Sequence, residues 1–214
     1  MNINTNLFSD NRIKDWNGNS NSIYKTLGAS NHTTKEREEY DFYATDPIAI
    51  DKLLTVEKPS FNIWECACGE GHLLKRLQEL GYNAFGTDIV DRGCGTTPRD
   101  FFNFKKEDVG CGVDILTNPP YKYAKEFVLH ALDLVAEDRK IYMFLKLTFL
   151  EGKARYKELF SKYPPQKIYV FCERVMCAKN GKFQEMKDGG GSAVAYAWFV
   201  WQKGWHGKTT IEWI

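Results

Sequence analysis

The stretch FNIWECACGEG, residues 61–71, joins an apolar run to a glycine-rich turn and decides the fold that we expect. Phe61 to Cys66 has the character of a strand, and leucines at helical spacing follow the turn until Gly81. A strand, a glycine-rich turn and a helix present free backbone N–H groups at the helix N-terminus, and glycines let a ligand approach the backbone closely. The stretch therefore predicts a ligand site at a strand–turn–helix junction.

A second predicted strand, Asn83 to Thr87, leads to an acidic residue, Asp88. A carboxylate about 20 residues beyond the glycines is suited to hold ribose hydroxyls. A dinucleotide site needs a third glycine three positions after Gly71, but this chain has Leu74 there. Glu70 would also lie beside the negative charge of a pyrophosphate. We therefore expect a ligand with a ribose and a positive charge, and not a nicotinamide dinucleotide.

A third predicted strand, Val113 to Leu116, runs into the loop Thr117-Asn118-Pro-Pro-Tyr121. The two prolines cannot continue a ladder, and a residue before proline prefers an extended backbone. The strand must therefore end in a stiff loop that presents an amide, backbone carbonyls and an aromatic ring. Two acceptors and one ring face suit a planar ligand that carries an amino group. The plainer alternative is a proline-stiffened turn.

Further alternating elements predict a parallel sheet with helices on both faces. The ligand crevice then lies beyond the carboxyl ends of the strands. Polar residues are expected at four such ends: Glu65, Asp88, Asp100 and Asn118. The further predicted elements are helices over Lys125–Ala136 and around Tyr156–Phe160, and strands over Lys140–Leu147, Lys167–Cys172 and Ala193–Trp201.

Length and composition indicate a single α/β domain over residues 41–214, preceded by a polar arm over residues 1–40 that we expect to be partly ordered. The chain has 214 residues and 43% hydrophobic residues, which suffices for one sizeable core. Its net charge of +1 is low for a nucleic-acid-binding protein, so any DNA contact must come from a local basic face.

The cysteines and the hydropathy pattern predict a cytoplasmic protein without a metal. The six cysteines form no Cys-x-x-Cys pair and have no neighbouring histidines, which disfavours a zinc site. We found no signal peptide and no apolar run long enough for a membrane span.

Two segments supply basic residues that could meet a substrate. Lys146, near the end of the predicted strand Lys140–Leu147, would lie on the rim of the crevice, or at a solvated helix start. The long loop from Glu173 to Gly191 has basic residues interleaved with an aromatic ring, which suits a nucleic-acid backbone and a flipped base. A solvated loop without a partner is the alternative. The candidate residues of this loop are Arg174, Lys179, Lys182 and Phe183.

Five segments resemble motifs of S-adenosylmethionine-dependent methyltransferases that act on amino groups. They span about residues 41–202, in the order of the class whose cofactor motifs precede the catalytic loop. The whole pattern is similar to small adenine-N6 DNA methyltransferases of the phage and prophage type. The segments are Asp41–Pro47, where Asp46 interrupts a Thr-Pro pair of the family, Glu65–Gly71, Arg99–Phe102, Asn118–Tyr121 and Ser192–Trp201.

The resemblance implies a Rossmann-like class I methyltransferase fold with a mostly parallel seven-stranded sheet, and S-adenosyl-L-methionine as cofactor. It implies that Asn118 and the Pro119 carbonyl accept the N6–H bonds of an adenine flipped out of duplex DNA, in a loop stiffened by Pro120. Tyr121 is implied to stack on the base, and Asp100 to accept the amino group of the cofactor adenine. The implied cofactor contacts are Tyr43, Thr45, Pro47, Glu65, Cys66, Gly69, Gly71, Asp88, Ile89, Asp100, Phe101 and Asn118.

Other functions stay open at this point. The same loop could methylate an amino group of RNA or a protein glutamine, although the glutamine enzymes usually carry a helical substrate domain before the cofactor domain. A non-catalytic, cofactor-binding DNA-interaction protein is disfavoured by the intact Asn118, Gly69 and Gly71. Only 13 residues follow Trp201, so we expect no separate target-recognition domain and expect specificity from the 173–191 loop, the arm or a partner. The target sequence and the oligomeric state stay undetermined.

Overall fold

The computed structural model describes residues 43–94, 98–179, 181, 183–188 and 194–214. The predicted arm, residues 1–40, lies outside them, as do Lys182 and the side chain of Lys179. Within the described residues, no helix is both long and apolar enough to cross a bilayer.

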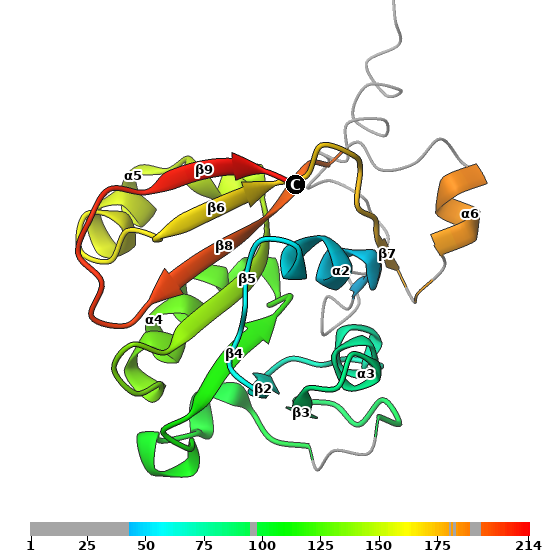
Figure 1. The fold of residues 1–214 in the computed structure, drawn as a ribbon, viewed down its shortest axis with the longest axis horizontal. Helices are drawn as coiled ribbons and strands as arrows, with labels where there is room; N and C mark the ends of the chain where they lie inside the picture. Colours follow the sequence, from blue (N-terminus) through cyan, green and yellow to red (C-terminus); the bar gives the residue numbers. More distant parts are fainter. Residues whose placement is uncertain (1–42, 95–97, 180, 182, 189–193) are drawn as a thin grey trace, which may run out of the picture. The chain divides into compact units, whose positions relative to one another are not determined.

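In this part of the chain, seven strands form one sheet in the order β3-β2-β4-β5-β8-β6-β9 (Figure 1). Six strands share one direction, and β8 runs antiparallel to both of its neighbours, β5 and β6. This arrangement confirms the predicted mostly parallel, seven-stranded sheet. The strands are β2 (Asn62–Glu65), β3 (Asn83–Gly86), β4 (Val113–Thr117), β5 (Lys140–Lys146), β6 (Lys167–Val170), β8 (Tyr196–Gln202) and β9 (Thr210–Trp213).

Helices cover both faces of the sheet, as predicted (Figure 1). The helices α2 (Ile48–Leu54) and α3 (His72–Glu79) pack on one face. The helix α4 (Ala124–Leu134) packs on the other, together with the π-helix η5 (Tyr156–Phe160), which continues the single turn α5 (Lys153–Arg155).

The buried strand β5 supplies side chains to both layers. Ile141, Met143 and Leu145 contact the α4 layer, whereas Tyr142 and Phe144 contact the α2 and α3 layer. This alternation follows from the two-residue period of a strand, and it explains why β5 is apolar at successive positions.

A small second sheet lies apart from the main one. The strand β1 (Tyr43–Thr45) pairs antiparallel with β7 (Cys177–Lys179), and β7 is followed by the short helix α6 (Phe183–Asp188). Four 3-10 helices complete the fold: η1 (Phe101–Asn103), η2 (Lys106–Asp108), η3 (Tyr121–Tyr123) and η4 (Leu147–Leu150).

The structure corrects two expectations and adds a strand. The 173–191 segment is not a continuous loop, because it contains β7 and α6. Asp100 does not end a strand; its carboxylate instead accepts a hydrogen bond from Phe102 N (3.0 Å) and caps η1. The strand β9 was not predicted, because its exposed sequence Thr-Ile-Glu-Trp lacks a clear apolar pattern.

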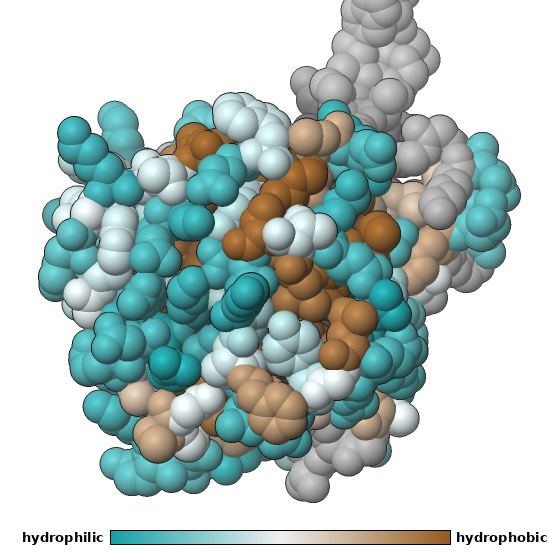
Figure 2. Space-filling view, in the orientation of Figure 1, coloured by the Kyte–Doolittle hydropathy of each residue, from teal (hydrophilic) through white to brown (hydrophobic). Residues whose placement is uncertain are grey.

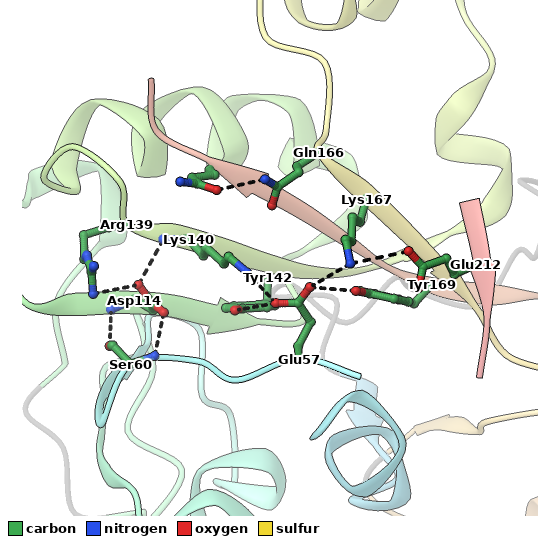
Figure 3. Close-up of polar contacts among 11 residues, drawn as sticks. Glu57, Ser60, Asp114, Arg139, Lys140, Tyr142, Gln166, Lys167, Tyr169 and Glu212 are labelled. Atoms are coloured by element: carbon green, nitrogen blue, oxygen red, sulfur yellow. Dashed lines mark hydrogen bonds and ion pairs between the residues drawn. The ribbon is translucent and has the colours of Figure 1, made fainter. Parts of the chain in front are cut away.

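A buried carboxylate, Glu57, joins β5 and β6 near the amino ends of these strands (Figure 3). It accepts hydrogen bonds from Lys140 Nζ (2.6 Å), Tyr169 Oη (2.6 Å) and Tyr142 Oη (3.2 Å). Burial alone would raise the pKa of Glu57, but the hydrogen bonds from Lys140 and Tyr169 outweigh it and lower the pKa. Because parallel strands begin at the edge opposite to the candidate site, this network stabilises the fold away from the site.

One face of the molecule carries an apolar band between hydrophilic surfaces, over the region of α2 (Figures 1 and 2). The helix and the turn after it expose Ile48 and Val56, each at about two fifths of its surface. The opposite side of α2 is fixed to the sheet, since Trp198 Nε1 donates to Ala49 O (2.9 Å).

Candidate active site

The candidate site lies at the carboxyl ends of β2 and β4, at the point of the sheet where successive connections run in opposite directions. The chain places β3 on one side of β2 and β4 on the other, and such a switch point leaves a crevice between the connecting loops. Glu65 is the last residue of β2, and Asn118 follows β4 directly. The structure thus brings the glycine turn and the Asn-Pro-Pro-Tyr loop to one edge.

Glycines shape the turn that follows β2. Gly69 and Gly71 have φ values of 54° and 77°, which favour glycine, and Gly71 is the N-cap of α3. Gly86 at the end of β3 is also required, since a Cβ there would lie 2.9 Å from Cys68 Sγ and 2.8 Å from Leu74 Cδ2. We did not single out Gly86 from the sequence, although its position before Asp88 is a usable signal.

Glu65 is a buried carboxyl group with an unused oxygen. Its side chain is 2% exposed, and within the part of the chain that the structure describes Oε2 has no hydrogen-bond partner. Burial, followed by the nearby Cys94 and Asp88, raises the pKa of Glu65 well above its usual value, although a backbone hydrogen bond from Leu74 acts the other way. An unpaired buried acid next to a glycine turn is a candidate for binding a cationic group.

Asp88 lies against the same turn. Its Oδ2 accepts a hydrogen bond from Gly69 N (2.8 Å), and its Oδ1 accepts one from Val90 N (3.0 Å). Ile89 beside it is half exposed. The carboxylate therefore stands at the mouth of the glycine turn, where a ribose would have to approach.

Phe101 and Cys66 belong mainly to the core at this edge. Phe101 is 2% exposed, and its ring contacts Trp64 and Phe127. Cys66 is buried, and burial raises the pKa of its thiol, so it remains a thiol at neutral pH. The partly exposed Asp100, which precedes Phe101, is the polar group of this segment.

The side chain of Asn118 is held by its NH₂ group. Nδ2 donates to Thr45 Oγ1 (2.9 Å) and to Tyr43 O (3.2 Å), both in β1. Asn118 Oδ1 is buried and has no hydrogen-bond partner among the described residues. The two prolines after it differ in exposure: Pro119 is buried, and Pro120 is partly buried. One acceptor of the loop is therefore unused, at the same edge of the sheet as the glycine turn.

The ring of Tyr121 already has two neighbours. Tyr196 of β8 stacks beside it at a centroid distance of 6.0 Å, and Lys146 Nζ lies 4.7 Å from the ring centroid. Burial raises the pKa of Tyr121 well above its usual value, so the phenol stays protonated. A planar ligand that stacks on this ring would also meet the Lys146 ammonium.

A cavity of about 250 Å³ opens next to these aromatic residues and shares Tyr196 with them. The segment from Val170 to Val175, which follows β6, forms most of its wall, and Ala195 completes it. Arg174 of this wall is exposed. The volume lies below the range of about 300–1,000 Å³ that is usual for drug-sized ligands.

The remaining predicted residues are spread over three elements. Pro47 is the N-cap residue of α2, and Lys179 ends β7. Phe183 begins α6, and its ring lies edge-on to His72 at the start of α3, with 5.6 Å between centroids. Phe183 thus lies beside the glycine turn. The prediction of Lys182 as a substrate residue falls outside the described residues.

Two residues of the site escaped the sequence analysis, Cys177 and Tyr196. Cys177 Sγ lies 3.4 Å from both Asn118 Nδ2 and Tyr121 Oη. Nothing in the short stretch around Cys177 distinguishes it from an ordinary apolar position. Within the described residues, no group of three histidine, cysteine or acidic side chains could hold a metal ion.

The fold of this chain, but not its sequence, is similar to that of known proteins. No protein-family model and no curated protein matches the sequence. A protein from Vibrio vulnificus YJ016 assigned as a modification subunit of a type I restriction enzyme is similar in structure, with a TM-score of 0.53 and 15% identity over 88% of this chain. A class I S-adenosylmethionine-dependent methyltransferase assigned in Listeria monocytogenes gives a TM-score of 0.47 at 12% identity over 78% of this chain.

This chain covers 48% of the Vibrio chain and 62% of the Listeria chain, so it spans less than two thirds of either. At such identities the likeness concerns the fold, and the assignment rests on the Vibrio protein and on the sheet described above. The chain has a Rossmann-like α/β fold that it shares with the Vibrio protein.

Proposed function

We propose that the protein transfers a methyl group from S-adenosyl-L-methionine to the N6 amino group of an adenine in DNA. The observation that carries the proposal is the Asn118 carboxamide, whose NH₂ group is anchored in β1 and whose oxygen is buried without a partner. A buried acceptor left unpaired costs about 1–3 kcal/mol, so a substrate donor that fills it gains a strong preference.

The glycine turn fits the cofactor. Glu65 Oε2 is an unpaired acid oxygen that would receive the ammonium of the methionine part. Asp88 would receive the ribose hydroxyls, and Asp100 the adenine amino group. Gly69 and Gly71 leave room for the ligand along the backbone. When bound, the cofactor supplies an electrophilic methyl group on a sulfonium, and the protein supplies the positions.

The loop after β4 fits an amino group as acceptor of the methyl. Asn118 Oδ1 and the carbonyl of Pro119 would accept the two N–H bonds of the substrate. These bonds draw the nitrogen lone pair out of conjugation with the ring and direct it toward the methyl carbon. A bond forms between nitrogen and carbon, the sulfur–carbon bond breaks, and the nitrogen then loses one proton to water. Because the proton leaves after the nitrogen has become cationic, no strong base is needed.

A flipped base in DNA is the substrate that we favour. A base must leave its stack to reach the Asn118 amide, and a cavity of about 250 Å³ shares Tyr196 with the stack on the Tyr121 ring, although Asn118 is not part of its wall. Lys146 and the exposed Arg174 bring positive charge to the rim of the site, where phosphates would lie. Adenine in RNA is the second candidate, and protein glutamine the third.

The test is to express the chain in a bacterial host that lacks adenine methylation and to measure methylated nucleosides in its DNA and RNA by mass spectrometry. We expect N6-methyladenine in DNA with the wild-type chain and none with Asn118→Ala. Methylation confined to RNA would assign the second candidate. Equal N6-methyladenine with the wild type and with Asn118→Ala would refute the role of the loop.

A further inference from the structure

Cys177 stands at the centre of the polar contacts behind Asn118. In the β1–β7 ladder it is the direct partner of Thr45, and both side chains are buried, at 4% and 3% exposure. Its sulfur lies 3.4 Å from Asn118 Nδ2, 3.4 Å from Tyr121 Oη and 3.7 Å from Tyr43 O. One thiol therefore contacts the amide and the ring of the Asn-Pro-Pro-Tyr loop at once.

The partners of Asn118 determine which way its amide points. The carbonyl of Tyr43 can only accept a hydrogen bond, so the NH₂ group must face it. The reverse orientation would place two acceptor oxygens against each other. Thr45 Oγ1 accepts the second N–H (2.9 Å), and this leaves Oδ1 directed away from β1.

We propose that Cys177 and Thr45 are positioning residues that orient the Asn118 carboxamide and hold it in a fixed relation to the Tyr121 ring. The proposal rests on the proposed function and extends it, because it names the residues that align the Asn118 amide and the Tyr121 ring. Thr45 acts on the amide alone, whereas Cys177 joins the amide to the phenol. Neither residue needs to touch the substrate.

A thiol suits this place for reasons of size and charge. Sulfur is large enough to reach the amide and the phenol together, and it both donates and accepts weakly. Burial raises the pKa of Cys177, although hydrogen bonds from Tyr121, Asn118 and Thr45 act against the rise. The group therefore stays neutral, and its S–H can donate to the Tyr43 carbonyl while its sulfur accepts from the Tyr121 phenol.

The alternative is that Cys177 only fills space under the loop. Two pairs of variants distinguish a positioning role from a space-filling role: Cys177→Ala against Cys177→Ser, and Thr45→Val against Thr45→Ser. The first member of each pair removes the polar atom, and the second keeps it. Cys111→Ala, an exposed cysteine outside this cluster, and Thr209→Val are matched controls.

We expect Thr45→Val and Cys177→Ala to lower kcat about tenfold, while the KM for the cofactor stays within about twofold, because the lost contacts orient a group that acts in the transition state. The serine variants should recover most of the rate. Equal losses in the alanine and serine variants of Cys177, or losses in KM with unchanged kcat, would overturn the proposal.

A second measurement decides the matter without turnover. The side-chain NH₂ of Asn118, assigned by the loss of its NMR signals in Asn118→Asp, should exchange slowly with solvent in the wild type and at least tenfold faster in Thr45→Val and Cys177→Ala. Unchanged exchange in both variants would refute the positioning role. If the wild type transfers no methyl group but the exchange rates change as expected, the proposed function fails and the positioning role stands.

Discussion

The affinity of the protein for S-adenosylhomocysteine should rise with pH, and Glu65→Gln should remove this dependence. The pKa of Glu65 is raised well above its usual value by burial and then by its negative neighbours, so the cofactor-free protein keeps this carboxyl protonated in mildly acidic solution. An ammonium group beside the unpaired Oε2 favours the ionised form of the Glu65 carboxyl group. Binding should therefore release a proton.

The size of the effect follows from proton linkage. Release of one proton increases the binding constant tenfold for each pH unit below the pKa of the free protein. The affinity at pH 7.0 should thus exceed the affinity at pH 5.5. The ammonium of the ligand stays protonated over this range, since an α-amino group has a pKa of about 7.7–8.0. Loss of a charged hydrogen bond in Glu65→Gln should weaken binding by about 1.5–3 kcal/mol at pH 7.

Isothermal titration calorimetry in two buffers of different ionisation enthalpy measures both the affinity and the number of protons released. Glu107→Gln, a change of an exposed carboxylate, is the matched control and should behave as the wild type. A wild-type affinity that does not change between pH 5.5 and 7.0, or a Glu65→Gln variant with the same slope as the wild type, would refute the assignment of Glu65 to the ammonium.

The raised pKa of Glu65 also affects the stability of the cofactor-free protein. A carboxyl group with a raised folded-state pKa stabilises the fold below its unfolded pKa and loses that contribution as the pH rises through the folded pKa. The cofactor-free wild type should therefore lose stability toward alkaline pH more steeply than Glu65→Gln, as thermal unfolding would record.

Three other changes test separate parts of the account. Asp88→Ala should weaken S-adenosylhomocysteine binding by about 1.5–3 kcal/mol, because ribose hydroxyls lose a charged acceptor, and calorimetry would show an unchanged affinity if the pocket is misplaced. Neutralising Arg174, Lys179 and Lys182 together should raise the KM for DNA and reduce its log–log salt slope by about one unit for each lost phosphate contact; identical slopes at two salt concentrations would exclude these residues as DNA contacts. Glu57→Gln should destabilise the fold by about 3 kcal/mol at pH 7 in denaturant titrations, since its lysine and tyrosine partners lose a buried charge. This difference should vanish as the pH falls below 4.5 and through the lowered pKa of Glu57, and a constant difference would argue against the charge.

Local patterns in the sequence sufficed for six of the seven strands of the central sheet and for the two loops that meet at its edge. The apolar runs before Glu65 and Asn118 predicted β2 and β4 within one or two residues, because buried parallel strands are continuously apolar. Since parallel strands end at one edge, the sequence also predicted that the glycine turn and the Asn-Pro-Pro-Tyr loop would lie together.

The parts that could not be predicted depend on contacts between distant segments. The strand β7 has only three residues, and it is defined by its pairing with β1, more than 130 positions earlier in the chain. The contact of Cys177 with Asn118 follows from that pairing, and no pattern in the sequence around Cys177 indicates it. Asp100 was expected at a strand end, but its side chain hydrogen-bonds its own backbone neighbourhood and starts a 3-10 turn instead.

The most direct test of the central claim is methyl transfer itself. Purified protein is incubated with methyl-labelled S-adenosylmethionine and, in separate reactions, with duplex DNA, single-stranded DNA, RNA and protein, and the labelled product is identified by mass spectrometry. We predict label on adenine N6 of DNA with the wild type, and a rate at least 100-fold lower with Asn118→Ala, about 3 kcal/mol in the transition state, with unchanged cofactor affinity. Absence of label from every substrate despite tight cofactor binding, or label transferred equally well by Asn118→Ala, would contradict the account.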